Sequence, residues 1–170
     1  KQPKADRPAR VKVFDFDVIN AAKNDAQYRG RLADNLGLIL KTESEYRELA
    51  RVDDVIAEQV LELAKCFPNF APTIEHVVEQ IALSSLTDDK AFAMRPVLLT
   101  GPPGVGKTAF FQALAEVIGV QFKSVDMASM TSGFVIGGSS SKWSDGSEGV
   151  VLNVIRTGQH ANPIILLDEV

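Results

Sequence analysis

One stretch near the middle of the chain constrains its fold more than any other feature. Residues 99–108 read LTGPPGVGKT, which fits the pattern G-x-x-x-x-G-K-[ST] at every specified position. Glycines allow the backbone to turn so tightly that successive N–H groups point into one concave, anion-binding surface. The stretch therefore predicts a phosphate-binding loop, which requires a strand before it and a helix after it.

The flanking residues supply both elements. Residues 96–100 (PVLLT) form a short apolar run between proline and glycine, which predicts a buried parallel strand. Residues 107–118 (KTAFFQALAEVI) are rich in helix formers, and Gly119 follows where a glycine commonly ends a helix. The alternative is a chance glycine-rich turn, and the complete motif in its required context argues against it.

We expect the loop to bind the phosphates of a nucleotide together with Mg²⁺. Lys107 would contact the β- and γ-phosphates, and the Thr108 hydroxyl would bind the metal ion. The loop residues that would surround the phosphates are Gly101, Pro102, Pro103, Gly104, Val105, Gly106, Lys107 and Thr108.

The residues after the loop predict the rest of a parallel sheet. Residues 120–126 alternate between apolar and polar side chains, as a strand does, and residues 149–157 read as a short helix. Residues 164–169 (IILLDE) form an apolar strand that ends in two carboxylates. The expected fold class is therefore α/β, a P-loop NTPase with a βαβαβ parallel sheet and right-handed crossovers.

Asp168 and Glu169 are the second group of candidate site residues. The carboxyl ends of parallel strands share one edge of a sheet, so we expect both residues on the side where Thr108 lies. Asp168 would then help to hold Mg²⁺. The alternative is that the two carboxylates merely end a buried strand.

The N-terminal part predicts a mostly helical extension with one possible strand. The Pro- and Phe-rich break at residues 68–72 separates this extension, residues 1–67, from a partial nucleotide-binding domain, residues 68–170. The expected elements are a strand at 11–16, helices at 18–28 and 32–40, and a longer amphipathic helix at 46–67 that breaks near 51–54.

Composition sets the broad class of the protein. The chain has 170 residues, 45% of them hydrophobic, and a net charge of −4, which gives no overall basic surface for nucleic acid. The lone Cys66 lies in an apolar helical pattern and is expected to be a buried thiol. With no apolar run long enough to span a membrane and no signal-like N-terminus, the expected location is cytoplasmic. The chain starts without Met and stops just after a strand, so we interpret it as part of a longer protein.

A Ser- and Gly-rich stretch at residues 129–149 predicts a mobile loop or short hairpin. Trp143, the only tryptophan of the chain, lies within it among polar residues. An indole is difficult to bury in such surroundings, so Trp143 is a candidate contact residue.

The motifs GPPGVGKT and ILLDE place the chain among proteins that resemble AAA+ ATPases. Residues from about 97 to 170 resemble the ATPase module of Lon-type proteases, in the P-loop and in Asn162-Pro163 before the LLDE strand. Residues 136–143 (IGGSSSKW) have the length and glycine placement of that family's pore loop, with Trp143 at its aromatic position and serines where the family has basic residues. Residues 1–70 resemble no Lon substrate-recognition domain.

This resemblance implies ATP and Mg²⁺ as cofactors and Glu169 as the residue that polarises the attacking water, so that Glu169 and Lys107 would be the catalytic residues. It also implies a ring of subunits, expected to be a hexamer, that couples ATP hydrolysis to unfolding or remodelling of a polypeptide. In the family, a strand that follows the LLDE strand inserts between it and the P-loop strand, so the chain would lack the middle of its sheet. The arginine that completes catalysis comes from a neighbouring subunit, so we expect the chain alone to be inactive.

Two alternatives remain. One is a nucleotide-dependent switch or loader that acts on nucleic acid or on a protein partner. The other is a P-loop kinase for a small molecule, which the pairing of GPPG with LLDE favours less because that pairing suits activation of water. Under the leading interpretation, neither a membrane nor nucleic acid is an expected partner of the protein.

Overall fold

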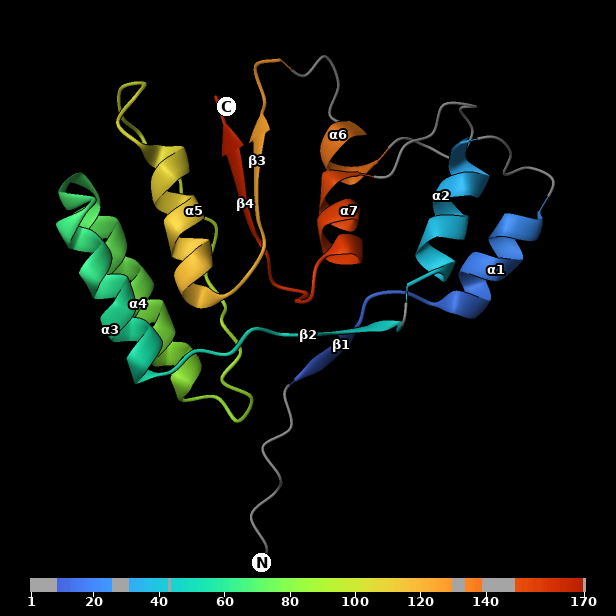
Figure 1. Ribbon diagram of the computed structural model, residues 1–170, viewed down its shortest axis with the longest axis horizontal. Helices are drawn as coiled ribbons and strands as arrows, with labels where there is room; N and C mark the ends of the chain where they lie inside the picture. The colour runs from blue at the N-terminus through green and yellow to red at the C-terminus, as the bar shows by residue number, and fades with distance from the viewer. Residues whose placement is uncertain (1–8, 26–30, 43, 130–133, 139–148, 170) are drawn as a thin grey trace, which may run out of the picture.

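The computed structural model describes residues 9–25, 31–42, 44–129, 134–138 and 149–169. Trp143 and most of the predicted pore loop lie outside these ranges. Figure 1 shows the helices of residues 54–62 and 71–85 at one end of the molecule and those of residues 16–24 and 31–40 at the other.

The N-terminal part consists of a strand pair that carries a helical hairpin. Strand β1 (Arg10–Lys12) pairs antiparallel with β2 (Tyr46–Glu48). The segment that connects the two strands in the sequence contains α1 (Phe16–Asn24) and α2 (Arg31–Leu40), which pack on each other. The predicted strand at 11–16 is too long, because the Asp15 carboxylate accepts a hydrogen bond from the Val18 N–H at 3.1 Å and starts α1.

The predicted helix over residues 46–67 is wrong in its first part, where the chain forms β2. Helix α3 (Asp54–Glu62) begins only after Asp53, whose carboxylate accepts from the Ile56 N–H at 3.0 Å. The short 3₁₀ helices η1 (Leu63–Lys65) and η2 (Pro68–Phe70) then lead into α4 (Ala71–Ser85). Cys66, between them, is exposed, so the prediction of a buried thiol is also wrong.

The C-terminal part forms a parallel strand pair between helices. Strand β3 (Phe122–Asp126) pairs in parallel with β4 (Ile164–Asp168), as the sequence predicts. Helix α5 (Lys107–Ile118) packs on both strands, and α7 (Val150–Thr157) lies across the pair from α5, beside the short α6 (Phe134–Gly137) (Figure 1).

The predicted strand at residues 96–100 is not formed. The segment is extended but belongs to no strand, and Leu98 is 77% exposed. A strand requires a neighbour about 4.8 Å away to complete its hydrogen-bond ladder. Within the described residues β4 pairs only with β3, so the parallel sheet has two strands there instead of the three that the sequence predicts.

Arg47 connects the N-terminal part to the end of α7. Its guanidinium donates to the carbonyl oxygen of Ile155 at 3.3 Å and to that of Arg156 at 3.1 Å. The same group lies 5.4 Å above the ring centre of Phe14. One side chain therefore binds the C-terminus of α7 to the segment that precedes α1.

The apolar core is continuous from α3 and α4 through α5 to β4. Val60, Val77 and Phe110 are completely buried in it. Residues from both sides of the boundary that the sequence predicts between 67 and 68 contribute to this core. None of the helices in the described ranges is long and apolar enough to cross a membrane.

Candidate functional site

The glycine-rich loop enters α5 through two left-handed glycines. Gly104 has a φ of 78° and Gly106, the N-cap of α5, a φ of 91°. A side chain at either position would be strained, since L-residues rarely adopt this conformation. Gly101 to Gly104 are exposed and Lys107 is half-buried at the start of the helix.

The loop has room for an anion. A Cβ atom built on Gly101, Gly104 or Gly106 would meet nothing within 4 Å. The first N–H groups of α5 have no acceptor within the helix, and the helix dipole makes this end partly positive. The residues present therefore fit a polyphosphate group, with Lys107 as the cation of the loop.

The structure brings the carboxylates of β4 to this loop. The Thr108 hydroxyl and one carboxylate oxygen of Asp168 are 3.3 Å apart, and the other Asp168 oxygen accepts from the Glu169 N–H at 3.1 Å. Glu169 has a φ of 57° and is exposed. Hydroxyl and carboxylate oxygens are the ligands that Mg²⁺ prefers, so Thr108 and Asp168 fit this metal ion.

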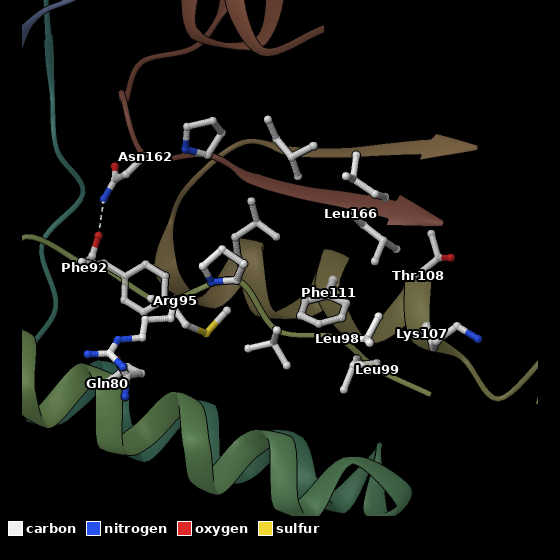
Figure 2. A pocket seen from close by; sticks show the side chains of 18 of the residues that line it. Gln80, Phe92, Arg95, Leu98, Leu99, Lys107, Thr108, Phe111, Asn162 and Leu166 are labelled. Carbon is white, nitrogen blue, oxygen red and sulfur yellow. Dashed lines mark hydrogen bonds between the residues drawn. The ribbon is translucent and has the colours of Figure 1, made fainter. Parts of the chain in front are cut away.

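A hollow of about 1920 Å³ extends from this site along β4, between this strand and residues 96–100. Figure 2 shows Lys107 and Thr108 at one end, Leu98 and Leu166 along the walls, and Asn162 near the other end. One wall is the extended segment at residues 96–100, and the other is β4. The hollow lies between these two segments, where the family resemblance implies that the middle of the sheet is missing.

Asn162 fixes the start of β4, a role that its sequence position before Pro163 does not reveal. Its side-chain oxygen accepts from the Ala50 N–H at 2.9 Å. Its amide nitrogen donates to the Ala50 carbonyl at 3.2 Å. It also donates to the Phe92 carbonyl at 3.0 Å, the bond that Figure 2 shows. The side chain thereby ties three segments of the chain together beside the hollow.

Asn69 is a second residue that sequence reasoning missed. It lies in η2, and its side-chain amide donates to the Val105 carbonyl oxygen of the glycine-rich loop at 3.0 Å. The proline beside it signals a turn, but nothing local in the sequence indicates a partner 36 positions away.

The two ends of the stretch that contains Trp143 meet at Gly149. A Cβ on Gly149 would lie 2.3 Å from the Ile136 carbonyl oxygen and 2.5 Å from the Gly138 nitrogen. This close approach is possible only for glycine, and it joins the end of α6 to the start of α7. The predicted contact residue Trp143 lies between them, outside the described residues.

A glycine-rich loop at the start of a helix, faced by a carboxylate at the end of a parallel strand, is the site of a P-loop NTPase. Residues 97–170 match the family described as "ATPase family associated with various cellular activities (AAA)". Over these residues the chain is similar to the AAA family.

Similar proteins include several Lon proteases. The chain is 26% identical to a Lon protease of Aquifex aeolicus over 130 residues, which are 76% of this chain and 15% of that protein. It is similarly 26% identical to a Lon protease of Nitrosococcus oceani over 131 residues, 76% of this chain and 16% of that protein. A peroxisomal Lon protease homolog 2 of Pichia angusta is 35% identical over 74 residues, 44% of this chain and 8% of that protein.

The chain spans about a sixth or less of the length of these relatives. The two longer matches include residues before position 68, because 130 residues do not fit between there and the end of the chain. The family match covers the residues that the sequence predicts, about 97–170, whereas the likeness to these two Lon proteases extends further towards the N-terminus than predicted.

Proposed function

We propose that the chain forms the ATP-binding part of a Lon-like AAA+ motor that couples ATP hydrolysis to unfolding or remodelling of polypeptides. The observation that carries this proposal is the approach of the Thr108 hydroxyl to Asp168 beside a glycine-rich loop with room for phosphate. The similarity to Lon proteases supports the polypeptide as the substrate. A net charge of −4 favours polypeptide over nucleic acid.

Each residue of the site has a role in this function. The loop from Gly101 to Thr108 and the ammonium group of Lys107 hold the phosphates, and Thr108 and Asp168 hold Mg²⁺, which neutralises charge on the phosphate oxygens. Glu169 orients the attacking water and accepts its proton. Its exposed carboxylate follows directly after Asp168, which suits this role.

The chain alone should turn over negligible ATP even though it binds the nucleotide. In the proposed ring, expected to be a hexamer, an arginine from the neighbouring subunit would meet the charge on the transferred phosphoryl group. Such an arginine contributes about 10³–10⁵ in rate in related NTPases. The location predicted from the sequence, cytoplasmic, stays a prediction, and some matched relatives are named peroxisomal.

We further propose that the hollow beside β4 receives another β-strand, as the resemblance to Lon-type proteases implies. The extended segment at 96–100 and the edge of β4 both offer unpaired backbone groups within the described part of the chain. In a longer protein, the amides of Leu98 and Ile165 should then exchange with solvent far more slowly than in this chain. Equal exchange rates would contradict the added strand.

Binding of a non-hydrolysable ATP analogue, measured by isothermal titration calorimetry, tests the function. Lys107→Ala removes the cation of the loop and should weaken binding roughly tenfold or more. Lys123→Ala, which removes an exposed lysine from β3, is the matched control and should bind normally. Unchanged affinity in a folded Lys107→Ala variant would refute the nucleotide site.

Stimulation of ATP turnover in the intact protein distinguishes the motor from a loader that acts on nucleic acid. An unfolded polypeptide should accelerate turnover, and DNA should have no effect. Stimulation by DNA alone would favour the loader.

A further inference from the structure

Asn69 stands on a rigid support next to the glycine-rich loop. The ring of its neighbour Phe70 stacks on Phe110 of α5 with centroids 4.5 Å apart and an interplanar angle of 6°. Phe67, just before η2, contacts Phe110 edge-to-face at 5.6 Å. Phe70 and Phe110 are buried, so η2 is fixed against the helix that follows the loop.

The residue that Asn69 contacts has a glycine on each side in the loop. Val105 stands between Gly104 and Gly106, both with positive φ. Glycine crosses between φ regions at little steric cost, so the peptide units around Val105 can rotate more easily than those of an ordinary loop. The hydrogen bond from the Asn69 side chain to the Val105 carbonyl at 3.0 Å opposes such a rotation.

The direction of the Val105 carbonyl determines the direction of the next N–H. The peptide between Val105 and Gly106 is planar and trans, so its C=O and N–H groups point to opposite sides. With the carbonyl held towards η2, the Gly106 N–H points away from η2. A rotated peptide would turn that N–H towards η2 and present a carbonyl oxygen on the other side.

We propose that Asn69 is a positioning residue that holds the Gly106 N–H in the orientation that binds phosphate. This inference rests on the proposed function of the loop. Asn69 acts through the loop backbone and not through the nucleoside. Its loss therefore weakens binding of any polyphosphate, whatever base it carries.

Tripolyphosphate, which has no base, is the probe that distinguishes an effect of Asn69 on phosphate binding from an effect on binding of the nucleoside. Calorimetry in the purified chain should show that Asn69→Ala weakens binding of tripolyphosphate and of a non-hydrolysable ATP analogue by the same factor, about three- to tenfold. Asn69→Asp should weaken both more, because a carboxylate oxygen would face the Val105 carbonyl. Gln112→Ala, which removes an exposed amide from α5, is the matched control and should bind as the unsubstituted chain does.

A second measurement needs no substitution. In the ¹⁵N-glycine NMR spectrum of the unsubstituted chain, the Gly106 amide signal should be among those that shift most when tripolyphosphate is added. A Gly106 signal that does not move overturns the proposal, whether or not the variants fold.

Two other results would also overturn it. One is a loss of affinity for the ATP analogue with unchanged affinity for tripolyphosphate, which would place Asn69 at the base. The other is a lower melting temperature with unchanged affinity for both ligands, which would make Asn69 merely structural. Failure of the proposed function looks different, since the unsubstituted chain would then bind neither ligand and Lys107→Ala would change nothing.

Discussion

The Thr108 hydroxyl and the Asp168 carboxylate lie 3.3 Å apart, although 60 positions separate the two residues in the chain. Thr108 stands in the first turn of α5 and Asp168 is the last residue of β4. Parallel pairing of β3 with β4 directs the end of β4 towards the start of α5. The fold thus assembles a hydroxyl and a carboxylate into one candidate metal site.

Substitution of either residue should remove the dependence of nucleotide binding on Mg²⁺. In Thr108→Ala and Asp168→Asn, the affinity for an ATP analogue with Mg²⁺ should fall towards the value measured in EDTA, because an oxygen ligand is lost. Thr108→Ser keeps the hydroxyl and should behave like the unsubstituted chain. Calorimetry with and without EDTA is the measurement, and a persistent Mg²⁺ effect in both variants would contradict the metal site.

Glu169→Gln should separate nucleotide binding from turnover in the intact protein. The amide cannot accept a proton from water, so turnover should fall roughly 10²–10⁴-fold while ATP affinity stays the same. Glu116→Gln changes an exposed glutamate on α5 and should leave both properties unchanged. A parallel loss of binding and turnover in Glu169→Gln would show that Glu169 has another role.

Gly149→Ala should destabilise the contact between α6 and α7. Its φ of −71° is compatible with alanine, so the cost comes only from the close contacts with backbone atoms of residues 136–138. We expect a loss of about 1–3 kcal/mol, which lowers the melting temperature by several degrees. Gly137→Ala adds the same methyl group where nothing lies within 4 Å and is the control. Equal melting temperatures for both variants would argue against the close approach.

Asn162→Ala should lower the stability of the whole chain. The substitution removes the side chain that binds the Ala50 N–H and the Phe92 carbonyl, which should lower the free energy of unfolding by about 1–3 kcal/mol. Urea denaturation followed by circular dichroism measures this loss. The exposed Gln159→Ala is the control, and a stability of Asn162→Ala equal to that of the control would mean that water replaces the amide.

Trp143→Ala tests the predicted pore loop in the intact protein. If the indole grips an extended polypeptide, polypeptide-stimulated ATP turnover should fall on the order of tenfold, while melting temperature and basal turnover stay near normal. An indole packed in a core would instead cost roughly 3–5 kcal/mol of stability on removal. A large loss of thermal stability without a specific loss of stimulation would refute the contact role.

The elements that the sequence predicts correctly are those with strong local signals. Helix α5 ends at Ile118, and Gly119, with a φ of 79°, caps it as its position in the sequence predicts. Strand β4 likewise forms at the apolar run that predicts it, and it ends at the carboxylate of Asp168. Both depend on interactions within a few residues or on a run that has to be buried.

The errors arise where distant partners decide the structure. Residues 96–100 have the composition of a buried strand, but a strand forms only beside another strand, and within the described residues a hollow lies there. Tyr46 and Leu49 have helical spacing, but pairing of Tyr46 with Lys12 in β1 decides the conformation. The contacts of Asn69 and Asn162 join segments 36 to 112 positions apart, and no local pattern indicates them.

We expect the edge of β4 that has no partner strand in the described part of the chain to affect how the protein behaves at high concentration. A strand edge with free N–H and C=O groups is a template for any other extended chain, including another copy of the same segment. Here that edge borders apolar walls that include Leu98, so both backbone pairing and water exclusion favour intermolecular contact. The feature that leaves space beside the phosphate-binding loop thus makes the chain prone to aggregation until another strand covers the edge.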